Sequence, residues 1–217
     1  MSVNEEIYQQ INEQLRLSNI TLVAVSKTKP IEDILALYNL GHRDFGENYV
    51  QELVEKAERL PKDIRWHFIG HLQTNKVRSI APFIYLIHGV DSVKLLKEIA
   101  KQAEKGGRVI DCLLQVHIAQ EETKFGFDET ELLNVDLKQF PNLKIKGLMG
   151  MASLTDDINR IRIEFKFLKT LFEKLKTQNP ELSILSMGMS ADYKIAIEEG
   201  SNIVRIGSLL FGERNYQ

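Results

Sequence analysis

The chain has 217 residues and a formal net charge of −2, and it is 43% hydrophobic and 27% charged. This is the composition of an ordinary globular protein, and the length allows one sizeable domain or two small ones. The nearly balanced charge argues against a broad nucleic-acid or membrane-surface binder, which would carry a basic stripe. It leaves room for a small anion held by a few groups.

Cysteine usage and the apolar runs indicate a reducing compartment. The single cysteine, Cys112, cannot form an intramolecular disulfide, and its apolar neighbours predict a buried side chain. The polar start of the sequence differs from a signal peptide. The longest apolar run, 80–90, is broken by Pro82 and His88 and is too short for a membrane span. We therefore expect a cytoplasmic protein that binds neither nucleic acid nor membranes.

In chain order, short β-branched or aromatic runs alternate with longer amphipathic segments. The predicted strands cover residues 21–27, 43–47, 65–70, 84–90, 109–118, 145–151, 184–189 and 203–207. The predicted helices cover residues 3–17, 32–40, 50–60, 92–104, 157–178 and 192–199. Asp91 is the expected N-cap of the 92–104 helix, and Gly200 is the expected C′ residue of the 192–199 helix.

Eight strands that alternate with helices in a single domain over 1–217 predict a (β/α)8 barrel with an extra N-terminal helix. A doubly wound open sheet is the alternative, and periodicity alone leaves it open. The sequence contains neither G-x-G-x-x-G nor G-x-x-x-x-G-K-[ST], the motifs of nucleotide sites that are common on open sheets.

Functional groups on such a barrel lie at the C-terminal ends of the strands. The first predicted strand ends at Lys27, and alternation places Val23, Val25 and Lys27 on one face. Burial depresses the pKa of a lysine, and the neutral amine is a nucleophile toward carbonyls. The alternative is a strand-end lysine that turns out to solvent.

The seventh and eighth predicted strands end in turns suited to an anion. Ser190 lies where the 192–199 helix begins, and Gly207-Ser208 opens the last helical turn. In barrels of this type these two loops often bind phosphate, where glycine lets the backbone approach and serine adds a donor. The alternative is two ordinary helix caps, and the carboxylate of Asp192 would repel a phosphate.

Arg205 shares a strand face with Ile203 and Gly207, either as a core ion-pair partner or as a ligand group. Barrel closure would place the eighth strand beside the first, so that Lys27, Arg205 and the 207–208 turn become neighbours. A carbonyl-reactive lysine, an arginine and an anion cradle together describe a pyridoxal 5′-phosphate (PLP) site.

Two other patterns point elsewhere but are incomplete. His67 and His71 have H-x-x-x-H spacing, but they lie at the end of a strand and lack the glutamate of a zinc-protease motif, so we expect no metal. Residues 188–192 imitate the G-x-S-x-G nucleophile elbow of serine hydrolases but lack its last glycine.

Seven runs, in order and nearly end to end, resemble a known family. They are AVSKTKP (24–30), FGENYVQ (45–51), WHFIGHLQTNK (66–76), KFG (124–126), GLMGM (147–151), SMGMSAD (186–192) and VRIGS (204–208). Together they resemble the pyridoxal-phosphate homeostasis proteins, single-domain relatives of the barrel domain of alanine racemase.

The resemblance implies a modified TIM barrel of PLP fold type III, with the cofactor bound covalently as an aldimine on Lys27. It implies phosphate contacts from the turns after the last two strands, and an arginine that faces the pyridine nitrogen. The residues implied to bind the cofactor are Lys27, Asn48, His71, Ser190, Arg205, Gly207 and Ser208. The family often has Thr or Ala in place of Ser208, but a serine keeps the backbone N–H and a hydroxyl.

Two functional classes follow. An arginine cannot accept a hydrogen bond from a protonated pyridine nitrogen, so the ring stays a poor electron sink for carbanion chemistry. Racemases of the related fold add a domain that carries a tyrosine acid/base, and residues 213–217 are too few for one. We therefore expect a non-enzymatic carrier and buffer of PLP, a monomer or weak dimer, with apo-enzymes that use PLP as partners. The alternative is a low-activity amino-acid racemase.

Overall fold

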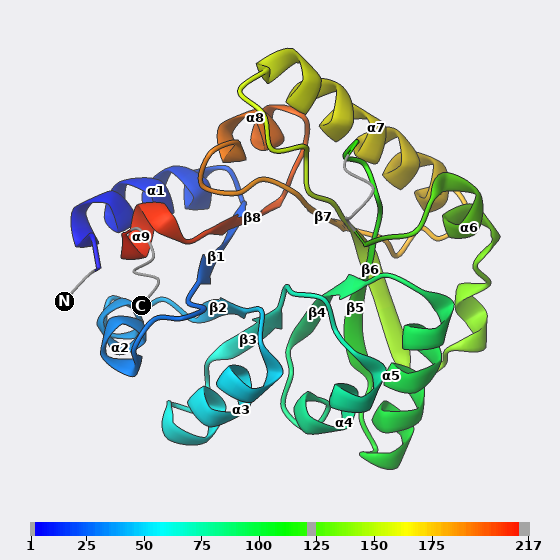
Figure 1. Ribbon diagram of the computed structural model, residues 1–217, viewed down its shortest axis with the longest axis horizontal. Helices are drawn as coiled ribbons and strands as arrows, with labels where there is room; N and C mark the ends of the chain where they lie inside the picture. The colour runs from blue at the N-terminus through cyan, green and yellow to red at the C-terminus, as the bar shows by residue number, and fades with distance from the viewer. Residues whose placement is uncertain (1–2, 121–124, 213–217) are drawn as a thin grey trace.

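The computed structural model describes residues 3–120 and 125–212, and in these it shows a closed barrel of eight parallel strands surrounded by helices (Figure 1). The strands are β1 (Thr21–Val25), β2 (Asp44–Glu47), β3 (Arg65–Phe68), β4 (Leu86–Val90), β5 (Ile110–Gln115), β6 (Leu143–Met149), β7 (Ile184–Ser186) and β8 (Ile203–Ile206). They pair in chain order, and β8 closes on β1 with Val23 opposite Arg205. The predicted (β/α)8 barrel is confirmed, and closure rules out the open sheet.

The helices cover the outside of the barrel. They are α1 (Glu5–Leu17), α2 (Ile31–Asn39), α3 (Val50–Arg59), α4 (Val77–Ile80), α5 (Val93–Lys105), α6 (Glu129–Asn134), α7 (Ile158–Lys176), α8 (Tyr193–Glu198) and α9 (Ser208–Phe211), with 3₁₀ turns η1 (Thr74–Lys76) and η2 (Leu137–Gln139). The extra helix α1 precedes β1 as predicted and lies beside α9 (Figure 1). The N–H of Asn4 donates to the carbonyl of Leu210 (2.8 Å), which ties the two helices together.

Local chemistry explains where the elements end. The predicted N-cap of α5 was wrong: the cap is Ser92, whose Oγ accepts the N–H of Leu95 (3.3 Å). Gly200, by contrast, has φ +94° and follows Glu199, the C-cap of α8, as expected of a C′ glycine. Strand β1 stops at Val25, two residues earlier than predicted, so Lys27 lies in the turn that follows. The short helices α4 and α6 were not predicted, because one or two turns show too little periodicity.

The hydrophobic core has two parts. The larger part lies between the strands and the helices, where α7 buries Phe165, Leu168 and Leu171, and it includes Cys112 as predicted. Each such side chain contributes about 1.5–3 kcal/mol when it is fully buried. The smaller cluster consists of Val23, Leu86, Leu113, Met149 and Ile203. It comes from strands all round the barrel and fills part of its interior. Within the described residues, no helix has the length and apolar character needed to cross a membrane.

Candidate cofactor site at the mouth of the barrel

The loop that carries Lys27 is fixed by buried polar bonds on both sides of the lysine. Lys27 itself is half-buried, so its side chain is neither fully buried nor fully turned out to solvent. Before it, Ser26 donates its hydroxyl to Glu47 Oε1 (2.6 Å). The ammonium of Lys56 donates to the carbonyl of Ser26 and to Glu47 Oε1, both at 2.8 Å. Strand β2 and helix α3 therefore hold the backbone from which Lys27 projects.

The residue after Lys27 is held in a strained conformation. Thr28 has φ +62°, a region that a β-branched residue rarely adopts. Its N–H donates to Glu52 Oε1 (2.6 Å), and the same oxygen accepts from Lys56 (2.6 Å). The lysine of α3 thus braces the turn after β1 through two carboxylates, which fixes where the Lys27 side chain starts.

Glu47 is the residue of this cluster whose ionised form is unfavourable in the folded protein. Its side chain is fully buried, and its second oxygen, Oε2, has no hydrogen-bond partner among the described residues. Burial raises the pKa of Glu47 to about 7, against the opposing pull of Lys56, and the nearby charge of Glu52 adds to the increase. Because Lys56 is shared between two carboxylates, it does not fully compensate the buried charge of Glu47.

The turns after β7 and β8 come together as the sequence predicted. Ser190 Oγ accepts the N–H of Gly207 (3.2 Å), so the serine proton remains able to donate to a ligand. A Cβ on Gly207 would lie 3.3 Å from both the Cβ and the carbonyl oxygen of Val25, so glycine keeps this corner open. Ser208 is exposed and begins α9, and the first N–H groups of a helix have no partner within the helix. These three residues form a group suited to a phosphate.

Asp192 does not contradict a phosphate here. Its carboxylate is buried and accepts the N–H of Met189 (2.6 Å), which closes the turn before α8. Its negative charge also acts on Arg205 and opposes the fall in the pKa of that guanidinium. The carboxylate thus shapes the 189–192 turn and balances a buried cation.

Arg205 is buried inside the barrel, with 3% of its surface exposed. The guanidinium donates to the carbonyl and hydroxyl of Ser186 (2.9 and 2.7 Å) and to the carbonyl of Gly150 (3.1 Å). The predicted alternative of a core ion pair does not describe these neutral partners. Desolvation lowers the pKa of Arg205 to about 10. These bonds use three of its five N–H groups. Among the described residues, the other two N–H groups make no recorded hydrogen bond and could donate to a further group.

Asn48 and His71 line a second group at the ends of β2 and β3. They border a cavity of about 330 Å³ that also includes Gly70 and Lys76. Asn48 Oδ1 is buried without a hydrogen-bond partner among the described residues. The ring of His71 stacks on Phe125 with centroids 3.8 Å apart. The two residues predicted at strand ends are thus close to one another, in a different sector from the Ser190–Gly207 contact.

The H-x-x-x-H pair does not converge on one point. His67 faces the barrel interior and contacts Asp44 and His88. His71 lies beyond the strand, and its Nδ1 is 2.8 Å from Asp91 Oδ2. Asp91, predicted as a helix cap, thus orients a histidine instead.

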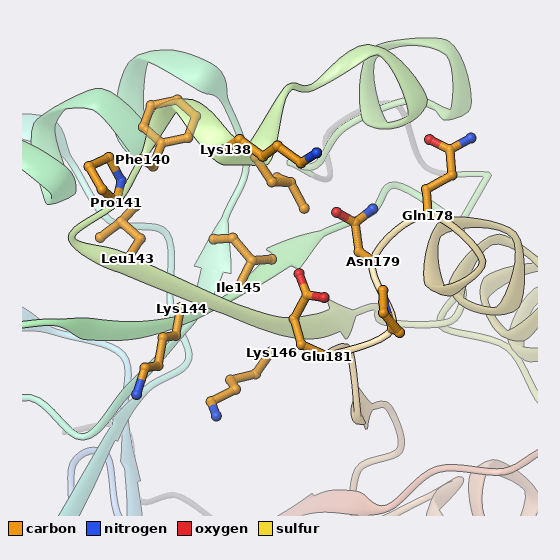
Figure 2. A pocket seen from close by; sticks show the side chains of 12 residues that line it. Lys138, Phe140, Pro141, Leu143, Lys144, Ile145, Lys146, Gln178, Asn179 and Glu181 are labelled. Carbon is orange, nitrogen blue, oxygen red and sulfur yellow. The ribbon is translucent and has the colours of Figure 1, made fainter.

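A larger cavity of about 610 Å³ lies away from these residues (Figure 2). It opens between the start of β6 and the loop that joins α7 to β7, and Lys138, Lys146 and Glu181 are among its lining residues. Its lining residues precede β6 and β7 or belong to the first half of β6. The cavity is therefore at the opposite end of these strands from the mouth, the end of the barrel at which Lys27, Ser190 and Gly207 follow their strands. None of the predicted cofactor residues borders it.

Sequence reasoning missed the residues that support the site. Glu47 and Lys56 hold the Lys27 loop, and Ser186 holds Arg205. Two signals were present in the sequence: a glutamate at a strand end, and a serine between Leu185 and Met187 in a buried strand. Neither identifies its partner, because each partner comes from another element.

Comparison with known proteins places the chain in a family. The family described as alanine racemase, N-terminal domain, matches residues 5–215. Relatives named pyridoxal phosphate homeostasis protein include that of Aquifex aeolicus, 45% identical over 90% of this chain and 87% of the relative. The one from Homo sapiens is 40% identical over 99% of this chain and 85% of the relative.

Solved structures agree with this placement. PipY of Synechococcus elongatus, 36% identical, superposes with a TM-score of 0.91 without PLP and 0.88 with PLP bound, over 95% of this chain and 99% of PipY. An alanine racemase of Clostridium difficile shares the fold at 14% identity with a TM-score of 0.78, and 58% of that chain is covered. The chain therefore belongs to the alanine racemase N-terminal domain family and, within it, to the pyridoxal phosphate homeostasis proteins.

Proposed function

We propose that this protein is a cytoplasmic, non-enzymatic carrier and buffer of PLP. The observation that carries the proposal is the contact between Ser190 and Gly207, which joins the turns after β7 and β8 beside the buried guanidinium of Arg205. The names of the relatives and the PLP-bound structure of PipY support the same ligand.

The residues at the mouth fit the parts of PLP. Ser190, Gly207 and Ser208 would hold the phosphate, with the hydroxyl of Ser190 as a donor. The two remaining N–H groups of Arg205 suit the lone pair of the ring nitrogen, and the unpartnered Oδ1 of Asn48 can accept from a polar ligand group. His71 lines the same mouth. The aldehyde of PLP supplies a carbonyl that condenses with an amine and releases water. Lys27 is the amine that we assign to this covalent bond.

The nature of Arg205 favours a carrier over an enzyme. A guanidinium has donors and no acceptor, so it pairs with an unprotonated ring nitrogen. An unprotonated ring withdraws electrons less strongly, and carbanion chemistry at an amino acid depends on that withdrawal. Binding and release of the cofactor make no such demand. We propose apo-enzymes that use PLP as the recipients.

Covalent binding is tested by reduction. The protein loaded with PLP should be yellow, and borohydride should fix the cofactor on the peptide that contains Lys27. Lys27→Ala should lose the absorption band of the covalent complex, while the phosphate contacts retain part of the affinity. An adduct found by mass spectrometry mainly on Lys29 or Lys76 would show that the lysine is wrongly assigned.

The carrier is separated from a low-activity racemase by proton exchange. A racemase needs two opposed acid/base groups at the α-carbon, and Lys27 supplies at most one. Loaded protein with L-alanine in deuterated water should show negligible exchange at the α-carbon and should still transfer PLP to an added apo-enzyme. Exchange at about 1 s⁻¹, the low end of ordinary turnover, would refute the carrier proposal.

A further inference from the structure

A chain of polar side chains crosses the interior of the barrel and ends at Arg205. Its members come from five strands: Asp44 (β2), His67 (β3), His88 (β4), Ser186 (β7) and Arg205 (β8). All five are buried. The interior of a (β/α)8 barrel is normally filled by branched apolar side chains, so five linked polar residues there need an explanation.

The contacts in the chain are continuous. Arg205 donates to Ser186 Oγ over 2.7 Å, and this oxygen is 3.0 Å from His88 Nδ1. The other ring nitrogen of His88, Nε2, is 2.9 Å from His67 Nδ1. His67 Nε2 is 3.0 Å from Asp44 Oδ1. Four hydrogen bonds thus join the guanidinium to the carboxylate of Asp44 at the N-terminal end of β2.

When each histidine carries a single proton, the two ends determine the direction of every bond between them. Arg205 can only donate, and an ionised Asp44 can only accept. His67 must then carry its proton on Nε2, which makes its Nδ1 an acceptor for the Nε2–H of His88. His88 Nδ1 is left to accept the hydroxyl proton of Ser186. With both histidines in the Nε2–H form, each of the three groups between the two ends donates once and accepts once.

The electrostatics favour this assignment. Although burial opposes ionisation of Asp44, hydrogen bonds from Arg65 and His67 outweigh it and hold the pKa of Asp44 well below its usual range. Desolvation lowers the pKa of His88, and the charge of Arg205 lowers it further, so His88 stays neutral.

The far end of the chain opens at the other end of the barrel from the mouth. Asp44 and His67 border a cavity of about 250 Å³. Its lining includes the first residues of six strands, among them Thr21, Arg65 and Ile203. Asp44 therefore lies at the opposite end of the barrel from the mouth. A metal site does not explain the histidines, since the described residues contain no group of three or more His, Cys, Asp or Glu placed to hold an ion.

We propose that Asp44, His67, His88 and Ser186 are positioning residues for Arg205. The chain fixes Ser186 as the acceptor for one arm of the guanidinium, so that the remaining N–H groups are presented to the ring nitrogen of PLP. The last step rests on the proposed function, whereas the direction of the chain is a property of the protein alone. The two can therefore be tested separately.

The direction of the chain is tested in ligand-free protein by ¹⁵N NMR of labelled histidines. His67 and His88 should each show a protonated Nε2 and an unprotonated Nδ1. Asp44→Ala removes the terminal acceptor and should produce a mixture of tautomers at His67. Asp63→Ala, which removes a surface ion pair with Arg43, should not. A protonated Nδ1 at His88 in the wild-type protein would overturn the proposal, whether or not PLP binds.

The effect on the mouth is tested with PLP-loaded protein. Ser186→Ala should shift the visible absorption of the bound cofactor and weaken its affinity about three- to tenfold, the order of the net contribution of one hydrogen bond. Ser186→Thr keeps the hydroxyl and should restore both. Ser201→Ala is the matched control, because Ser201 is a buried serine that bonds backbone groups of β7 and β8 outside the chain.

The outcomes are distinct. If Ser186→Ala behaves like Ser201→Ala in both absorption and affinity, Ser186 does not position Arg205 and the proposal fails. If wild-type protein shows the expected tautomers but binds no PLP, the proposed function fails and the direction of the chain stands.

Discussion

Replacement of Glu47 by glutamine should remove a loss of stability that the wild-type protein undergoes as the pH rises. Glu47 is buried beneath the Lys27 loop, with Oε1 bonded to Ser26 and Lys56 and Oε2 unpartnered among the described residues. In Glu47→Gln the amide oxygen still accepts both bonds, while the charge is removed. The variant therefore isolates the cost of ionising this carboxyl inside the protein.

The magnitude follows from the pKa of Glu47, which burial raises from 4.5 to about 7. A shift of this size corresponds to about 3 kcal/mol, since one unit is worth about 1.4 kcal/mol. The sign is that of a raised pKa: the folded state binds the proton more tightly than the unfolded state. The stabilisation is therefore complete below about pH 4.5 and is lost as the pH rises through about 7.

The assay is urea unfolding of both proteins at pH 4.5, 6 and 8. The unfolding free energy of Glu47→Gln relative to wild type should rise by about 3 kcal/mol across this range. A buried amide N–H without a partner adds a constant cost at every pH and leaves the trend unchanged. Glu55→Gln is the matched control, because Glu55 is exposed on α3, the helix that carries Lys56. A flat difference for Glu47→Gln would show that Lys56 fully compensates the buried charge.

Three further predictions use single changes. Ser190→Ala should weaken the affinity for PLP about ten- to a hundredfold, the value of one charge-assisted hydrogen bond, and the affinity for pyridoxal far less. Ser183→Ala, at an exposed serine, should leave both affinities unchanged. Equal wild-type affinity for the two ligands would refute the phosphate placement. Gly188→Ala should lower the stability by about 1–3 kcal/mol and distort the turn before α8, because Gly188 has φ +94° and a Cβ would lie 2.6 Å from the Cβ of Ala196. An unchanged melting temperature would contradict this. Burial raises the pKa of the Cys112 thiol, so a thiol reagent should label it only when the protein unfolds, and rapid labelling of native protein would refute its burial.

The candidate residues at the mouth could be selected from the sequence because they follow from one rule about barrels. Functional groups of a barrel gather at the ends of its strands, and this rule selected Lys27, Ser190 and Gly207 as candidate site residues. Barrel closure then predicted that β8 lies beside β1, which placed Arg205 in the same sector as Lys27. The contact between Ser190 and Gly207 confirms that the last two turns meet.

The supporting residues could not be predicted in the same way, because their roles depend on distant partners. His88 appears in the sequence as one polar residue in an apolar strand, and its partner Ser186 lies 98 positions away. The spacing of His67 and His71 indicated a pair, but strand alternation turns His67 into the interior and leaves His71 beyond the end of the strand. Their tautomers depend on both ends of a chain that exists only in the closed barrel.

The interior of the barrel has two parts, one packed with apolar side chains and one that contains a chain of hydrogen-bonded polar side chains. Apolar residues such as Val23 and Leu113 fill one part of it, as in an ordinary barrel. The other part holds the chain from Asp44 to Arg205, although well-packed apolar residues in place of buried charges are often neutral or stabilising. Stability alone therefore gives no reason for the chain. The proposed role of Arg205 does give a reason, because a buried arginine keeps one orientation only when its donors are satisfied, and Ser186 and Gly150 satisfy three of them.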